Sequence, residues 1–300
     1  MPKRANLSLR NQKRGGGPID IGTRTRFATE ARPRRVLLVH GYNVSQRQAE
    51  KAFEKFEESL YEFAKRLADD CCWVFWPGDA PIPFIRTIAY YRKLKNAKAC
   101  APEFAEYLKE LSPAHGEAPH VIIIGHSLGC RLILEALGLL AQQQREEALK
   151  INLKIEIILM AAAVPITLLF EGGSLREAAF QSTRRMVMYS RYDSVLRDFF
   201  AIGQRLGRDG LGCPLEAVGR FGLPSIGVWT GKYELYHYDH SHYWKTPGTA
   251  HLIASWLGAA NAPRSIASRM SLDKPRPSER LLATIRPFPE AREIAERRVS

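Results

Sequence analysis

Short apolar runs alternate with stretches of helical periodicity along the middle of this 300-residue chain. The clearest helical stretch is 46–67, where apolar residues recur in steps of four and three and so share one face of a helix. Further helices are expected near 98–111, directly after Ser127, and at 248–258. The apolar runs are strand-sized, and they lie at 35–40, 71–76, 120–124, 154–160, 185–190 and 225–230. Strands that alternate with helices predict a parallel sheet covered by helices on both faces.

This pattern places the folded domain at residues 34–260. No pair of strands is evident before Val36, so we expect a sheet that is trimmed on its N-terminal side. Residues 1–33 and 261–300 are low in large apolar side chains and rich in Lys and Arg, and the second segment is also rich in proline. Such segments bury too little apolar surface to offset the entropy of ordering. We therefore expect one α/β domain between two basic, mostly disordered tails.

The formal net charge of +13 raises the question of a nucleic-acid partner. Much of the excess lies in the two ends, and neither interleaved aromatic residues nor a known nucleic-acid motif accompanies it. We therefore expect no specific nucleic-acid site, although the tails are suited to contact acidic surfaces.

Three other features of the composition bear on location and cofactors. No apolar run is long enough to cross a membrane, and no apolar stretch follows the basic N-terminus, so neither a transmembrane segment nor a secretory signal is predicted. The five cysteines show no metal-ligand spacing, and their odd number favours reduced thiols in a cytoplasm. We expect no metal and no cofactor.

One apolar run ends in Gly125-His126-Ser127-Leu128-Gly129, and a helical pattern starts at once. Glycines on both sides of a serine suit a sharp strand-to-helix turn, because a Cβ atom there would collide with neighbouring backbone. Such a turn lifts the serine hydroxyl off the edge of a sheet, where it can act as a nucleophile. The alternative is a tight turn without chemistry, so partners for Ser127 must be sought.

Functional groups in parallel α/β sheets gather at the carboxyl ends of the strands. A serine nucleophile needs an imidazole to take its proton and an acid to hold that imidazole in one tautomer. Asp193 follows the strand at 185–190 and suits the acid, although it could also cap the helix that begins there. Candidate histidines lie after the last strand, at His237, His240 and His242. Asp239 lies too close to them in sequence to act as the acid that orients one of them.

Six motifs occur along the chain in the order in which one known family has them. They are VHGYNVS (39–45), FWPGDA (75–80), KNA (95–97), IIGHSLGCR (123–131), LMAAAVP (159–165) and MYSRYDSVL (188–196). On these motifs residues 34–258 resemble the α/β-hydrolases, in particular an uncharacterised bacterial esterase/lipase-like branch with V-H-G-Y-N after the first core strand. The chain departs from that branch at Leu128 and Cys130, where relatives often have Met and Asn. The resemblance implies an α/β-hydrolase fold and a Ser-Asp-His triad.

Two assignments within the expected site stay open. The segment that begins at His240 resembles the H-S-x-Y/F segment that carries the catalytic histidine in lipase-like relatives, so His240 is the expected base. His242 is the alternative base and otherwise a substrate-binding candidate. The expected oxyanion donors are the backbone N–H groups of Leu128 and Tyr42. Asn43 is a further substrate-binding candidate or an ordinary turn residue.

These predictions favour a cytoplasmic serine hydrolase that cleaves a small-molecule carboxylic ester through an acyl-enzyme. Acyl transfer or thioester cleavage on the same triad is an alternative, and so is a non-catalytic binding protein on a hydrolase fold. The apolar segment 81–91 is expected to form either a lid or acyl-binding wall above Ser127, or part of the core.

Overall fold

The computed structural model describes residues 6–10, 25–27, 33–79, 86–146, 150–201, 204, 216–224 and 227–259. All of these belong to one compact unit, Met1–Asn261. The expected C-terminal tail, residues 261–300, lies outside the described residues, and so does the beginning of the expected lid segment, 81–85.

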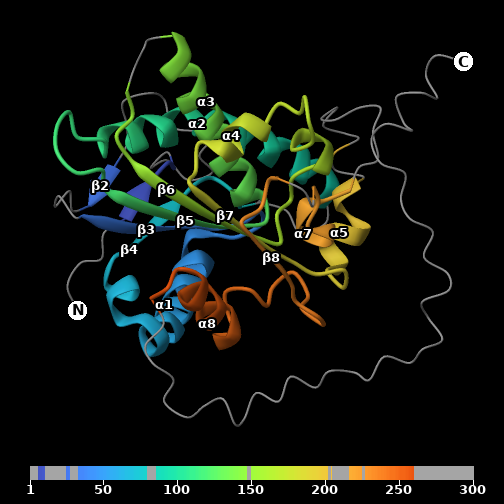
Figure 1. The fold of residues 1–300 in the computed structure, drawn as a ribbon. Coiled ribbons are helices and arrows are strands. Elements are labelled where there is room, and N and C mark those ends of the chain that lie inside the picture. Colours follow the sequence, from blue (N-terminus) through green and yellow to red (C-terminus); the bar gives the residue numbers. More distant parts are fainter. Residues whose placement is uncertain are drawn as a thin grey trace, which may run out of the picture. The chain divides into compact units, whose positions relative to one another are not determined.

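A sheet of eight strands runs through the described part of the chain (Figure 1). The strands lie side by side in the order β2–β1–β4–β3–β5–β6–β7–β8. Neighbouring strands are parallel except for β1 and β2, which are antiparallel. Their bounds are β1 Asn6–Ser8, β2 Thr25–Phe27, β3 Arg34–Val39, β4 Cys71–Phe75, β5 His120–His126, β6 Lys154–Met160, β7 Arg184–Tyr189 and β8 Gly231–Glu234.

Helices cover both faces of this sheet. Helices α2 (Arg86–Glu110), α3 (Leu128–Glu146) and α4 (Arg176–Phe180) lie on one face, and α1 (Gln46–Asp69) and α8 (Pro247–Trp256) lie on the other (Figure 1). Three short helices connect the elements within the described residues; they are η1 (Ile166–Leu168), α5 (Ser194–Asp198) and α7 (Val218–Phe221). The predicted fold class, a mostly parallel sheet between two helical layers, is confirmed. Within the described residues no helix is long and apolar enough to cross a membrane.

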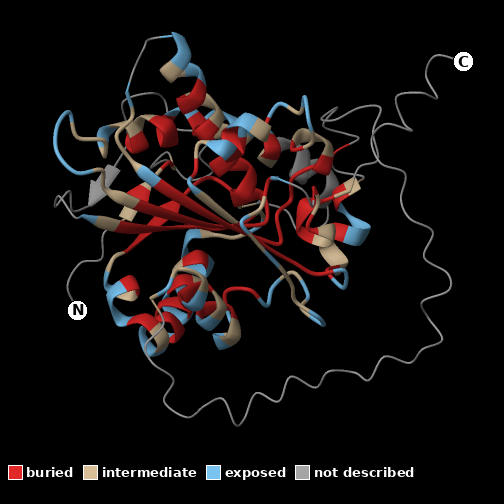
Figure 2. Ribbon diagram, viewed as in Figure 1, coloured by how far each residue is buried: buried red, intermediate tan, exposed pale blue. Residues whose placement is uncertain are grey.

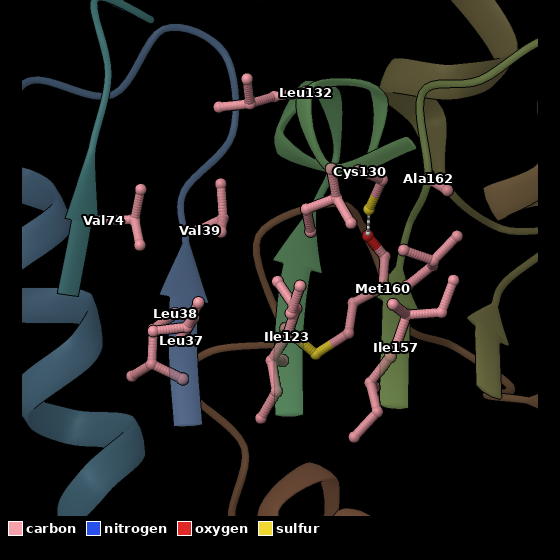
Figure 3. Close-up of a cluster of buried hydrophobic side chains, with 14 of the residues drawn as sticks. Leu37, Leu38, Val39, Val74, Ile123, Cys130, Leu132, Ile157, Met160 and Ala162 are labelled. Carbon is pink, nitrogen blue, oxygen red and sulfur yellow. Dashed lines mark hydrogen bonds between the residues drawn. The ribbon is translucent and has the colours of Figure 1, made fainter. Parts of the chain in front are cut away.

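The central strands are buried on both faces, as Figure 2 shows. Leu37, Ile123 and Ile157 are register partners on β3, β5 and β6, and their side chains form a fully buried row in the cluster of Figure 3. Burial of one such side chain contributes about 1.5–3 kcal/mol to folding. The carboxyl edge of the sheet is therefore a rigid platform for groups that extend from it.

Helix α1 begins at the predicted residue because a reciprocal pair of hydrogen bonds, a capping box, closes its N-terminus. Ser45 Oγ accepts a hydrogen bond from the Gln48 N–H (3.3 Å), and the Gln48 side chain accepts one from the Ser45 N–H (2.8 Å). The predicted apolar face is buried through Phe53, Phe56 and Leu60. This cap fixes the end of the loop that joins β3 to α1.

The expectation of a sheet without strands before Val36 is wrong. Residues 6–8 form β1, which lies parallel to β4, and residues 25–27 form β2. Leu7 and Leu9 are 1% and 0% exposed, and Leu9 N–H donates to the Phe75 carbonyl (2.7 Å). Apolar residues at every second position let this segment bury one row of side chains despite its positive charge. Residues 6–10 therefore belong to the folded domain and not to a tail.

Two element boundaries also differ from the predictions. Helix α2 begins at Arg86 and not near residue 98, and it includes Pro102, a residue type that usually disrupts a helix interior. The final strand is Gly231–Glu234 and not 225–230. Val228 is fully buried, so the apolar character of that segment reflects packing before the strand begins.

Candidate active site

Ser127 lies in the turn between β5 and α3, with a positive φ of 53°. Its N–H donates to the Met160 carbonyl on the neighbouring strand (2.9 Å). A Cβ on Gly129 would lie 2.4 Å from the His40 carbonyl oxygen, and a Cβ on Gly125 would lie 2.4 Å from Ile133 Cδ1. The turn therefore requires glycine at position 129, because a side chain there would collide with the backbone at the end of β3, whereas at position 125 the Ile133 side chain would have to shift.

Two polar side chains from other strand ends form a hydrogen-bonded line with the Ser127 hydroxyl. His240 Nε2 lies 2.8 Å from Ser127 Oγ, and His240 Nδ1 lies 2.8 Å from Asp193 Oδ2. Asp193 is fully buried and follows β7, whereas His240 follows β8. With the imidazole neutral, Nδ1–H donates to the carboxylate and Nε2 accepts the serine proton. The arrangement joins a hydroxyl, a base and an acid in one line of hydrogen bonds.

Asp193 also caps helix α5, as the alternative interpretation predicted. Its Oδ1 atom accepts the Leu196 N–H (2.9 Å) while Oδ2 faces His240. The cap and the acid are thus two oxygens of one carboxylate, and the cap fixes its orientation. Asp239 does not contact the His240 ring nitrogens; its Oδ1 accepts hydrogen bonds from the Ser194 hydroxyl (2.8 Å) and N–H (3.0 Å).

The loop after β3 lies directly against Ser127. A Cβ on Gly41 would lie 2.9 Å from Ser127 Cβ, so only glycine permits this approach. Tyr42 and Asn43 line the cavity in front of Ser127, and Leu128 is the first residue of α3. Asn43 has a φ of 58°, and its N–H donates to the Gly78 carbonyl (2.8 Å). Its backbone therefore serves the turn, and the residue also lines the cavity.

The same loop is held by a buried histidine and an ion pair. His40 Nδ1–H donates to the Gly41 carbonyl (2.9 Å), and Nε2 accepts the Trp76 N–H (3.2 Å). Burial lowers the pKa of His40 to about 4, so the ring is neutral. Beyond Trp76, Arg10 pairs through Nη2 with both Asp79 oxygens (2.9 Å each) and anchors the segment that carries Gly78. His40 is thus a structural residue under the loop.

His126 is a member of the site that the sequence reasoning missed. Its Nε2–H donates to the His240 carbonyl (2.8 Å), and the two rings lie 4.8 Å apart. Burial, together with the nearby His240 ring, lowers the pKa of His126 to about 3. A neutral His126 therefore holds the backbone of His240. Its place directly before Ser127 gave no signal for this role, because the partner is a backbone carbonyl far away in sequence.

His242 does not lie where a substrate-binding role would require it. The side chain is exposed, and its Nδ1 accepts the Asp239 N–H (3.0 Å). It is not among the residues that line the cavity, whereas Ser241 and Lys245 are. In this structure the His242 ring contacts the Asp239 N–H and not the cavity, so its expected role in substrate binding stays a prediction without support from this geometry.

A cavity of about 650 Å³ opens in front of Ser127. Its walls are mostly apolar and come from the β3–α1 loop, from the first half of α1, from α5 with the residues after it, and from the segment 240–245. Cys130 is fully buried and hydrogen-bonds the Met160 carbonyl, and burial raises its thiol pKa, so it is no competing nucleophile (Figure 3). Among the described residues, no group of three or more His, Cys, Asp or Glu side chains could hold a metal ion.

The sheet, the sharp turn at Ser127 and the helical layers together define an α/β-hydrolase fold. The chain belongs to the family described as "alpha/beta hydrolase of unknown function (DUF900)", whose profile matches residues 22–212. The matched stretch contains Ser127 and Asp193 and ends before His240.

Several solved structures are similar to this chain at low sequence identity. A predicted CIB-like hydrolase from Thermoplasma acidophilum is 16% identical, with 78% of this chain and 90% of that chain covered and a TM-score of 0.41. An esterase from Pyrobaculum calidifontis is 14% identical, with 75% and 77% covered and a TM-score of 0.37. Carboxyl esterase 2 from Tuber melanosporum is 11% identical, with 79% and 80% covered and a TM-score of 0.41. No curated protein matches the chain. With identities and TM-scores this low, the function must be argued from the site itself.

Proposed function

We propose that this protein is a serine hydrolase that cleaves carboxylic esters through an acyl-enzyme on Ser127, His240 and Asp193. The observation that carries the proposal is the pair of 2.8 Å contacts from Ser127 Oγ to His240 Nε2 and from His240 Nδ1 to Asp193 Oδ2. A buried carboxylate on the far side of an imidazole fixes its tautomer and stabilises the imidazolium that forms during attack. The cavity in front of Ser127 offers room for an acyl group.

The first half of the reaction forms an ester on the enzyme. Ser127 Oγ attacks the substrate carbonyl carbon while its proton passes to His240 Nε2. The carbonyl oxygen becomes an oxyanion that accepts hydrogen bonds from the backbone N–H groups of Leu128 and Tyr42. When this intermediate collapses, the bond to the alcohol oxygen breaks and His240 protonates the leaving alkoxide.

The second half releases the acid. A water molecule loses a proton to His240 Nε2 as its oxygen attacks the acyl carbon. The new oxyanion forms in the same place, and its collapse breaks the bond to Ser127 Oγ, which takes back the proton from His240. The products are an alcohol and a carboxylic acid. His126 takes no proton in this scheme; its support of the His240 backbone keeps the base in line.

The test is covalent labelling by a fluorophosphonate probe, followed by turnover of 4-nitrophenyl esters. We expect the probe to label Ser127 and the Ser127→Ala variant to lose both labelling and turnover. Ser241→Ala is the matched control, because Ser241 also lines the cavity and adjoins His240 but has no part in the scheme. Unchanged turnover in Ser127→Ala, with a native circular dichroism spectrum, would reject the proposed mechanism.

A cytoplasmic location remains a proposal that rests on cysteine usage, since Cys71, Cys72, Cys100 and Cys130 are free thiols. The contact of the basic ends with acidic surfaces likewise remains a prediction.

A further inference from the structure

The cavity in front of Ser127 combines an apolar interior with a cationic margin. Its apolar wall is built largely from side chains of the β3–α1 loop, helix α1, the region of α5 and the segment 240–245; they include Val44, Ala49, Ala52, Val195, Phe199 and Trp244. Phe199 is 44% exposed, so the apolar surface continues outward to the opening. Such a wall suits an alkyl or aryl group and does not by itself select a polar one.

Three lysines line the same cavity: Lys51, Lys55 and Lys245. All three are exposed residues, as expected of ammonium groups at a cavity margin. Lys51 and Lys55 lie one helical turn apart on α1. Lys245 lies five residues after His240, in the segment that follows β8. The lysines at the cavity margin therefore come from two separate segments of the chain.

No carboxylate balances these charges inside the cavity. Among the described residues that line it there is no Asp or Glu, and none of the three lysines forms an ion pair with a described residue. Glu50 and Glu54 lie on the same helix but do not line the cavity.

We propose that the site selects esters that carry an anionic group, with the apolar part in the cavity and the anion at Lys51, Lys55 and Lys245. This inference rests on the proposed esterase function and adds its substrate class. An anion at this margin would be attracted by the ammonium groups that line the cavity. The anion could belong to the acid half of the ester or to the alcohol half, and the experiment separates the two.

The experiment compares kcat/KM for two matched pairs of esters. The first pair is 4-nitrophenyl pentanoate against mono-4-nitrophenyl glutarate, which places the charge at the far end of the acyl chain. The second pair is 4-acetamidophenyl butanoate against 4-carboxyphenyl butanoate, which places the charge on the leaving group. We expect the anionic member of one pair to be favoured about tenfold at low ionic strength, and we expect added salt to reduce that advantage.

The triple variant Lys51→Gln/Lys55→Gln/Lys245→Gln tests whether the lysines cause the preference. It should lower kcat/KM for the favoured anionic ester about tenfold and leave its neutral partner within about twofold. The control is Lys65→Gln/Lys98→Gln/Lys150→Gln, which removes the same total charge from exposed residues that do not line the cavity. The control should keep the preference of the wild-type protein. Equal rates for both members of both pairs, or equal losses in the two triple variants, would overturn the inference.

A binding measurement separates this inference from the proposed function. Calorimetry on Ser127→Ala should show octanoate binding more tightly than octan-1-ol, and the lysine triple variant should abolish the difference. If no ester turns over and no probe labels Ser127, the esterase proposal fails while a retained preference for octanoate supports the anion site. If esters turn over but octanoate and octan-1-ol bind equally, the esterase proposal stands and the anion site fails.

Discussion

His240 is the side chain through which the proposed proton transfers all pass. Its two ring nitrogens contact Ser127 Oγ and Asp193 Oδ2, whereas the exposed ring of His242 contacts the Asp239 N–H. We expect His240→Ala to lower kcat for 4-nitrophenyl butanoate by about 10²–10⁴-fold, because a general base is lost. His242→Ala is the matched control and should stay within about threefold of the wild-type protein. Steady-state kinetics of both variants decides between the two histidines, and a collapse in His242→Ala alone would exchange their roles.

The sequence predicted which residues meet at Ser127 because each lies at a strand end and the carboxyl ends of parallel strands share one edge. Asp193 and His240 were predicted on that basis, together with a family resemblance. In the structure His240 lies within hydrogen-bond distance of Ser127, and Asp193 lies within hydrogen-bond distance of His240. The role of His126 was not predictable in this way. It depends on the backbone carbonyl of His240, which lies 114 positions away in sequence, and no pattern of side chains encodes that carbonyl. The orientation of His242 likewise depends on a local turn.

Strand β1 is the element in which charge and periodicity gave opposite indications. Arg10 and the basic residues around it suggested a solvated tail, but Leu7 on β1 and Leu9 directly after it are buried next to β4. The Arg10 charge is itself used, since the guanidinium pairs with Asp79. A three-residue strand gives too short an alternation to outweigh composition, which is why it was overlooked.

We therefore expect Leu9→Ala to destabilise the protein substantially. The side chain is fully buried, so its truncation leaves a cavity between β1 and the neighbouring core and should reduce the free energy of unfolding by about 2–5 kcal/mol. Asn6→Ala, at a partly exposed position of the same strand, should change it by less than about 0.5 kcal/mol. Urea denaturation followed by circular dichroism measures both. Equal, negligible effects would mean that residues 6–10 contribute nothing to the stability of the fold.

Across the whole molecule, the sheet places two neutral histidines at the edge that carries the site. His40 lies under the β3–α1 loop and His126 lies beneath His240, and burial lowers the pKa of each, to about 4 and about 3. His40 must be neutral because its Nε2 accepts the Trp76 N–H while Nδ1–H donates to the Gly41 carbonyl, and His126 donates through Nε2–H to the His240 carbonyl. The fold thereby links the stability of the domain to the protonation state of groups beside the site.

This linkage predicts how stability changes with pH. In the unfolded chain a histidine has a pKa near 6.5, so the unfolded state takes up protons as the pH falls from 7 to 5 while folded His40 does not. The free energy of unfolding therefore falls over this range, by about 2 kcal/mol for one such histidine, and the loss continues until the pH reaches the folded pKa of about 4. Above pH 7 the contribution of His40 is fully present.

The variant His40→Asn removes the titrating ring and keeps an amide donor near Nδ1. We expect it to be less stable than the wild-type protein at pH 7, because the buried ring is lost, but to lose about 2 kcal/mol less than the wild-type protein between pH 7 and pH 5. His115→Asn is the control, since His115 is exposed, and it should keep the wild-type pH dependence. Urea unfolding of the three proteins at both pH values gives the slopes directly. If His40→Asn and the wild-type protein lose the same stability on acidification, His40 is not a neutral, buried ring and the support it gives to the β3–α1 loop must be assigned to other groups.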